Sequence, residues 1–355
     1  SPSGAVVNTR KPQFSWQGMG DPDGDAVGYT LQVSHSAFFD AIALSAQTTD
    51  TNLTIASSLD SIGHYYWRVI AEDGEGGSRI SASAEFTIDA VNPEVYVGVL
   101  PSTVLKSYLA IYAYASETLS SVSGVAVLND ATTGAQVDSG AITLNAIAGQ
   151  PNLYETSYTL SSAGILTIRV LGVDTAGNSA TGNKVYAVSS IGKTFAGSVS
   201  SADKQLTLSI DKGTMNRDGM LLIARDDEAS AVMAKALGKL SGETSSEEAM
   251  ALMSSAGEGY TILSSGGALV KAVRVSVRYS EEAIENLKSR YSDFDERKIG
   301  LYREENGQWM YEGGEGFNGS VTASLKTLGK VKLFYNDTHV FVPSSLELSQ
   351  NYPNP

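Results

Sequence analysis

The sequence predicts a mainly β protein that consists of three tandem β-sandwich domains. Apolar and polar residues alternate over short runs, which is the period of half-buried strands. Turn residues separate these runs, and the chain contains 35 glycines but only 18% charged residues. Its 355 residues exceed what one hydrophobic core usually organises, which indicates two or three domains.

Charge and composition exclude several classes of function. The net charge of −14 and the pI near 4.7 argue against nucleic acid as a partner, because such binding needs clustered Lys and Arg. Neutral polymers or cations suit this charge better. The chain has no cysteine, so disulfides and thiolate metal sites are excluded. No apolar run reaches the roughly 18 residues of a membrane span, and none is expected.

The first domain is predicted at residues 1–89. Its opening stretch, KPQFSWQGMGDPDGDAVGYTLQVS, alternates on both sides of a turn-rich centre, which indicates strand, loop, strand. In the later stretch HYYWRVIAEDGEGG, alternation puts Tyr65 and Trp67 on one face of a strand and Tyr66 and Arg68 on the other. The stretch SASAEFTI closes the domain as its last strand.

These features resemble a bacterial fibronectin type III domain, which has a Trp on an early strand, a late Tyr-Tyr-Trp-Arg-Val strand and a closing Phe-Thr-Ile. The resemblance implies that Trp16 and the pair Tyr65 and Tyr66 are core and corner residues. A ligand platform is the alternative interpretation of these aromatics. Core packing is preferred, because aromatic residues in such sandwiches usually fill the core.

The second domain is predicted at residues 90–190, where alternating stretches such as YLAIYAYAS and GILTIRVLGV are separated by turn residues. The stretch LTIRVLGVDTAGN resembles the penultimate strand and turn of bacterial immunoglobulin-like domains. Asp174, Gly177 and Asn178 suit a tight turn there, because Gly and Asn accept positive φ and Asp accepts hydrogen bonds from backbone amides.

The third domain is predicted at residues 191–342. It begins with KQLTLSIDKGTMNRDGMLLIARDD, which reads as two strands around a glycine turn. The order of its later segments resembles a β-sandwich related to the ZU5 domain that ankyrins, zonula occludens proteins and netrin receptors share. The residues that match the pattern of that family are Tyr279, Trp309, Leu328 and Gly329.

A helical insertion is predicted in this domain at residues 228–256. Its first helix carries an apolar stripe of Met233, Leu237 and Leu240, and its second begins at a capping box of Ser245 and Glu248. The second helix carries a stripe of Met250, Leu252 and Met253. Both stripes either fold back on the domain's own sheet, which is the preferred interpretation, or dock on a partner or a neighbouring domain. A further short helix is expected after Ser280 as N-cap.

No catalytic motif is found, so the sequence predicts a protein that is not an enzyme. There is no nucleophile elbow, no His-Glu-x-x-His motif and no phosphate loop. The three histidines, His35, His64 and His339, are scattered along the chain without a neighbouring carboxylate pair. No organic cofactor is expected.

The metal site suggested by the sequence is the stretch DPDGD. Asp21, Asp23 and Asp25 place carboxylates at alternate positions of one loop, and such hard oxygen ligands suit calcium. The stretch lacks the distant bidentate Glu of a helical calcium loop, and Asp, Pro and Gly are also ordinary turn residues. The turn is the preferred interpretation, with a weak calcium site as the alternative.

The last stretch, residues 343–355, loses the strand alternation and is expected to be a linker. Its motif LSQNYPNP resembles the opening of the C-terminal sorting domain of type IX secretion cargo, a domain that normally continues beyond this motif. The resemblance implies that the type IX secretion machinery is a partner. It also implies an extracellular or outer-surface location in a Gram-negative bacterium.

Together these features predict a non-catalytic spacer or adhesion region at the C-terminal end of a larger exported protein. The alternative is a set of accessory modules of an upstream secreted hydrolase, with carbohydrate binding as one form of that role. Surface polysaccharide or neighbouring protein subunits are the further candidate partners. The fold alone does not decide, because β-sandwiches host many functions.

Overall fold

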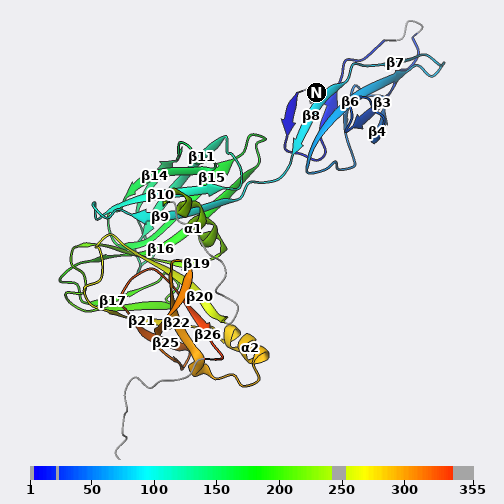
Figure 1. The fold of residues 1–355 in the computed structure, drawn as a ribbon. Helices are drawn as coiled ribbons and strands as arrows, with labels where there is room; N and C mark the ends of the chain where they lie inside the picture. Colours follow the sequence, from blue (N-terminus) through cyan, green and yellow to red (C-terminus); the bar gives the residue numbers. More distant parts are fainter. Residues whose placement is uncertain (1–3, 21–23, 242–252, 339–355) are drawn as a thin grey trace, which may run out of the picture.

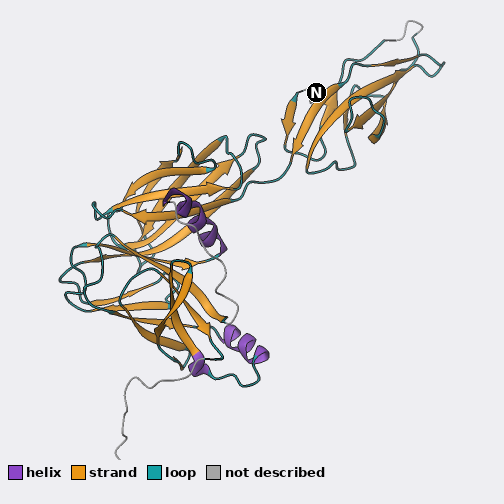
Figure 2. Ribbon diagram, viewed as in Figure 1, coloured by secondary structure: helices purple, strands orange, loops and turns teal. Residues whose placement is uncertain are grey.

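The computed structural model describes residues 4–20, 24–241 and 253–338 of the chain. The protein is mainly β, with 54% of its residues in strands and 7% in helices, and its strands form several packed sheets (Figure 2). This confirms the predicted fold class. Neither α1 nor α2, the two α-helices of the described ranges, has the length and apolarity that crossing a bilayer requires.

The first domain, drawn in blue in Figure 1, is a sandwich of a six-stranded sheet and a two-stranded sheet. The larger sheet has the order β1-β8-β6-β3-β4, with β7 paired to β6, and β1 runs parallel to β8. Its strands are β1 (Ala5–Val7), β3 (Gly28–Ser34), β4 (Ile42–Thr48), β6 (Ile62–Glu72), β7 (Ser78–Ile80) and β8 (Ala84–Asp89). The smaller sheet pairs β2 (Gln13–Ser15) with β5 (Asn52–Thr54).

The aromatic residues of this domain divide between its core and its surface. Tyr65 is buried, and its hydroxyl accepts from the Asp60 amide at 3.0 Å, as expected of a corner residue. Trp16 is half-buried and packs edge-on against Tyr29 at the margin of the core. Tyr66 lies on the outer face of β6, so its predicted place in the core is wrong. Alternate side chains of a strand point to opposite faces, and Tyr65 already takes the inner one.

The strands after residue 94 form three sheets. The four-stranded sheet, in the order β13-β14-β10-β9, consists of β9 (Val95–Pro101), β10 (Tyr108–Ala115), β13 (Asn145–Ala146) and β14 (Leu153–Thr159). The five-stranded sheet, in the order β17-β18-β21-β25-β24, consists of β17 (Gly197–Ser200), β18 (Leu206–Ile210), β21 (Val273–Arg278), β24 (Gly316–Phe317) and β25 (Ser320–Leu325).

A nine-stranded sheet lies opposite both of these sheets and is common to the second and third domains. Its order is β12-β11-β15-β16-β19-β20-β26-β22-β23. The strands are β11 (Ser121–Asn129), β12 (Gln136–Thr143), β15 (Gly164–Val173), β16 (Ser179–Ile191), β19 (Gly219–Asp226), β20 (Ser254–Ser264), β22 (Ile299–Glu305), β23 (Gln308–Gly313) and β26 (Lys330–Tyr335). The predicted domain boundary after residue 190 therefore falls within β16.

The pairing of β16 with β19 joins the two cores. Along β19, Met220 and Leu222 pack into the core under the four-stranded sheet, whereas Leu221 and Ile223 pack into the core under the five-stranded sheet. The first six residues of the strand are all buried, which explains its continuous apolar run, GMLLIA. The two strands predicted around the glycine turn exist as β18 and β19, but they belong to opposite sheets and do not form a hairpin.

Helix α1 (Glu228–Ser241) forms the first part of the predicted insertion and crosses to the second domain (Figure 1). Met233 and Ala236 are buried against Leu153, on the outer surface of the four-stranded sheet. The preferred interpretation, packing on the domain's own sheet, is therefore wrong for this helix. The reason is that a row of aromatic side chains, Tyr96, Tyr112 and Tyr114, offers its apolar stripe a surface there.

The start of α1 is fixed by a buried lysine. Lys184, on β16, is 7% exposed, and its Nζ donates to the Arg225 carbonyl at 2.7 Å and to Asp227 Oδ1 at 3.0 Å. Asp227 caps the helix by accepting from the Ser230 amide at 2.9 Å. Burial raises the pKa of Asp227, but the hydrogen bonds from Ser230 and Lys184 outweigh it and lower the pKa below its ordinary value.

The remaining helical predictions have different outcomes. The second helix of the insertion, around Ser245 and Glu248, lies outside the described residues, and strand β20 begins at Ser254. The later short helix forms as α2 (Glu281–Arg290), and Ser280 caps it by accepting from the Ala283 amide, as predicted. A 3-10 turn, Glu296–Lys298, precedes β22.

We expect Leu222→Ala to destabilise the second and third domains together. Leu222 is fully buried, and a cavity there costs about 2–5 kcal/mol. Calorimetry should show one shared transition for these domains moving to lower temperature while the first domain's transition stays. The matched control is Leu31→Ala in the first core, which should move only the first domain's transition. Separate transitions for the second and third domains would contradict the prediction.

Candidate metal centre

The predicted calcium loop remains untested by the structure. Asp21 and Asp23 lie outside the described residues, and Asp25 is exposed. The turn and the weak calcium site therefore both stay open for this loop.

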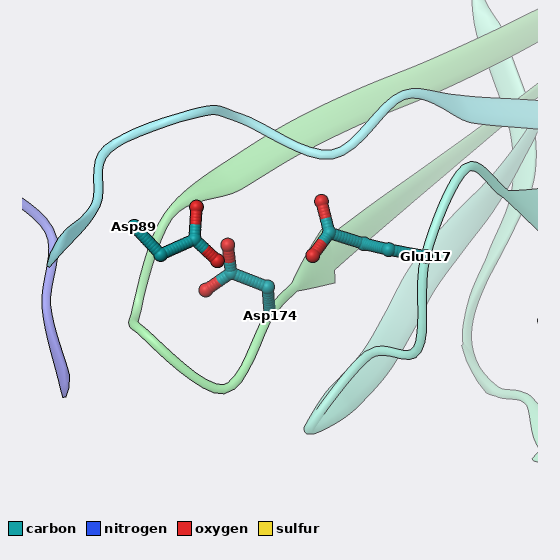
Figure 3. A group of neighbouring side chains, drawn as sticks. All are labelled: Asp89, Glu117 and Asp174. Atoms are coloured by element: carbon teal, nitrogen blue, oxygen red, sulfur yellow. The ribbon is translucent and has the colours of Figure 1, made fainter. Parts of the chain in front are cut away.

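A second group of carboxylates converges where the first domain meets the second. Asp89 is the last residue of β8, Glu117 lies in the loop after β10, and Asp174 follows β15. One carboxylate oxygen of each lies within 4.8 Å of the other two, and Figure 3 shows the three side chains pointing toward one another. We call these residues the carboxylate cluster.

The turn DTAGN holds Asp174 in place. Its Oδ1 accepts from the amides of Ala176 and Asn178 at 2.8 and 2.9 Å, and its Oδ2 accepts from Asn178 Nδ2 at 2.8 Å. Gly177 adopts a φ of 91° in this turn, a conformation that side chains other than glycine rarely accept. The predicted tight turn is thus present. It leaves Asp174 only 1% exposed at the base of the cluster.

The same turn contacts the end of the first domain. Asn178 Nδ2 donates to the Asp89 carbonyl at 2.8 Å, which brings Asp89 beside Asp174. Ser120 Oγ donates to the Asp174 carbonyl at 2.6 Å and fixes the loop that carries Glu117. The three carboxylates are therefore positioned by a hydrogen-bonded network.

The electrostatics of the cluster favour a cation. Burial, followed by the charges of Asp89 and Asp174, raises the pKa of Glu117 above its ordinary value. None of the ion pairs among the described residues includes a member of the cluster. Converging carboxylates with no cationic partner are the hard oxygen ligands that calcium takes, with water completing its six to eight ligands.

Sequence reasoning missed this cluster because its members lie on three separate segments. The sequence marks Asp174 as a turn residue, but Asp89 and Glu117 lie in no local motif. Only the packing of the loops brings them together. The one signal in the sequence is the turn motif DTAGN. It marks the end of the second domain at which the segments that carry Asp89 and Glu117 also lie.

The histidines form no catalytic arrangement in the described part of the chain. His64 Nε2 lies 3.4 Å from Glu85, and His35 Nε2 lies 3.9 Å from Asp60. Both pairs lie on the surface of the first domain, with more than two fifths of each side chain exposed. His339 lies outside the described residues.

Residues 2–91 match the model of the Rha78A-like N-terminal immunoglobulin domain. The first domain is immunoglobulin-like. The match spans the first domain and no more of the chain, and immunoglobulin-like and fibronectin type III-like domains are generally non-catalytic. No curated protein matches the sequence.

Two solved structures are similar to parts of this chain. The fibronectin(III)-like modules of CbhA from Clostridium thermocellum align with 52% of this chain and 88% of their own at 16% identity, with a TM-score of 0.28. The α-L-rhamnosidase of Streptomyces avermitilis, complexed with L-rhamnose, aligns with 52% of this chain at 14% identity and a TM-score of 0.21. The aligned part is 24% of the rhamnosidase's length.

We expect calcium to stabilise the junction of the first two domains. If the cluster binds calcium with a Kd of about 1 mM, 10 mM calcium adds about 1.4 kcal/mol of stability. The melting temperature should therefore rise with calcium in wild-type protein but not in Glu117→Gln. Asp25→Asn is the control for the predicted loop. A calcium effect that is lost in Asp25→Asn and kept in Glu117→Gln would assign the ion to the loop instead.

Without calcium, the contribution of Glu117 to stability should fall as the pH rises through its raised pKa. The folded protein favours the protonated carboxyl, so its contribution is fully present below the ordinary value of 4.5 and is lost above it. Denaturation measured in a chelator from pH 4 upward, in wild type and Glu117→Gln, checks this. An unchanged pH profile in Glu117→Gln would show that the carboxyl is not destabilised by its neighbours.

Proposed function

We propose that this chain is a non-catalytic, semi-rigid region that sets the distance and orientation between other parts of a larger exported protein. The observation that carries the proposal is the sheet shared by the second and third domains. Independent domains on linkers move freely by default, whereas a large apolar interface holds them in one arrangement. A continuous hydrogen-bonded sheet makes such an interface.

Two further contacts support a fixed arrangement of these domains. Helix α1 comes from the third domain and packs on the outer sheet of the second. Ser265 Oγ, after β20, donates to the Lys106 carbonyl in the β9–β10 loop at 2.8 Å. Together with the β16–β19 pairing, these contacts lie at three separate places, so they resist bending in more than one direction.

Export by a type IX system is the second part of the proposal. It is supported by the resemblance of LSQNYPNP, at residues 348–355, to the opening of a sorting domain.

A role as accessory modules of a secreted hydrolase is the second candidate. The match of the first domain to the Rha78A-like N-terminal domain favours it. The sequence that precedes Ser1 in the full gene distinguishes the candidates. A hydrolase signature there supports the accessory role, and further sandwich repeats support the spacer.

The spacer proposal predicts a narrow range of distances between the second and third domains. Because the chain has no cysteine, Thr132→Cys and Lys326→Cys introduce two unique sites for spin labels on exposed positions. Electron–electron double resonance should give one narrow distance distribution. The reference is Thr118→Cys with Thr132→Cys, two positions that flank β11 within one domain. A distribution clearly broader than the reference would overturn the proposal.

The export proposal predicts that the motif is needed for secretion. In the full-length precursor, replacing residues 348–355 by a Gly-Ser linker should retain the protein in the periplasm of a type IX-competent host. Fractionation followed by immunoblotting measures this. The matched control replaces residues 343–347 in the same way and should still be exported. Equal export of both variants would rule the motif out as a signal.

A further inference from the structure

The outer face of the six-stranded sheet in the first domain presents an ordered set of polar and aromatic side chains. On β3, Thr30 and Gln32 point away from the core, and on β6 Tyr66 and Arg68 do so. Gln32 and Arg68 are directly paired across the two strands, and Ser34 is paired with Tyr66. Thr30, Gln32, Tyr66 and Arg68 are partly exposed, whereas Ser34 is buried, so a ligand can reach this face at those four side chains.

Arg68 is held in one orientation on this face. Its Nε donates to Gln32 Oε1 at 2.9 Å, and its guanidinium carbon lies 4.2 Å from the centroid of the Phe39 ring. Among the described residues, no carboxylate forms an ion pair with Arg68, although the chain carries 39 acidic residues. The two terminal nitrogens thus remain available to an acceptor from outside.

The turn that carries Phe39 is strained and well fixed. Phe39 has a φ of 55°, which is unfavourable for an aromatic residue, and its amide donates to the Ser36 carbonyl at 3.1 Å. The Phe38 amide donates to Ser36 Oγ at 3.2 Å. This turn places Phe39 over Arg68 and leaves Phe38 90% exposed. Strain of this kind persists where the surrounding contacts impose it, and it is common at binding sites.

Aromatic and polar groups lie on either side of Arg68 along the sheet. Tyr66 is two residues away on the same face of β6, with its ring 5.0 Å from that of His64. Toward the other end of β6, a shallow cavity of about 370 Å³ is lined by Thr30, Gln47 and Glu72, among others. The cavity, the guanidinium and the tyrosine ring therefore follow one another along β6, an arrangement that suits a chain-like ligand.

We propose that this outer face binds a carboxylate-bearing saccharide, with a carboxylate at Arg68. Glu72 in the cavity and Glu85, which is directly paired with Tyr66, limit the contacts on either side of Arg68 to hydroxyl groups and sugar rings. The terminal nitrogens of Arg68 match a carboxylate in bidentate geometry, which a neutral sugar does not offer. The Tyr66 ring supplies a flat apolar surface for the C–H groups of a sugar ring. The side-chain amides of Gln32 and Gln47 supply donors and acceptors for hydroxyl groups.

An acidic peptide could also pair with Arg68, but the sheet face favours the saccharide. A peptide that adds to a sheet uses a free strand edge, whereas these side chains lie on a face. The inference goes beyond the spacer role and does not rest on it. The spin-label distances test rigidity in the second and third domains, and the experiment below tests binding in the first.

Calorimetric titration of the whole protein with alginate oligosaccharides, in a chelator to exclude calcium, tests the inference. We expect binding by wild type and a loss of about tenfold or more in Arg68→Gln, the effect of removing a charge-assisted pair. Arg68→Lys keeps the charge but not the bidentate geometry and should also bind weakly. Tyr66→Ala should bind less tightly than wild type, and each variant's melting curve checks that the domain is folded.

Arg79→Gln is the matched control. Arg79 is an exposed arginine on β7 of the same domain, and it pairs with Ala71, whose side chain faces the core. The Arg79→Gln variant should bind alginate like wild type, and carboxyl-reduced alginate should not bind to the wild-type protein. The inference is overturned if Arg79→Gln loses as much affinity as Arg68→Gln, or if the reduced polymer binds equally well. Binding of oligoglutamate with the same affinity, or no binding of alginate at millimolar concentration, would also overturn it.

Discussion

The two-sided burial of β19 is the constraint on which the second and third domains depend. Its successive side chains enter two different cores, and its two edges pair with β16 and β20. A strand with both faces and both edges occupied cannot shift by one residue, because the shift would exchange the side chains of the two cores. The register of β19 thereby fixes the relative position of the domains on either side of it.

Helix α1 and Lys184 show how the chain tolerates a charge at this junction. A buried ammonium is costly unless its donors are satisfied. Lys184 has three acceptors, the Arg225 carbonyl, Asp227 and Ser230 Oγ, which match its three donors. Asp227 and Ser230 also form the start of α1. Lys184, a side chain of the second domain, therefore fixes the third-domain helix that packs on the second domain. The helix and the shared sheet act on the same interface.

Much of the fold could be predicted from the sequence, because alternation reports which segments are strands. It does not report which strand pairs with which, so the sequence predicts the two strands around the glycine turn but not the shared sheet that β19 joins. The carboxylate cluster could not be predicted, because Asp89, Glu117 and Asp174 meet only through packing of separate loops. Tyr66 is a different case. Alternation places it on the face of β6 opposite to Tyr65, whereas the family resemblance implies a core or corner position, and the structure agrees with alternation.

The shared sheet also limits how this protein can be rearranged in evolution. Sandwich domains on linkers can be duplicated, exchanged or lost singly. A cut after β16 would instead leave that strand with an unpaired edge. It would also expose Tyr186 and Val188, because the side chains of β19 that pack beside them in the core would be lost. We therefore expect the second and third domains to be inherited as one unit, whereas the first, which belongs to no common sheet with them, can be recombined alone.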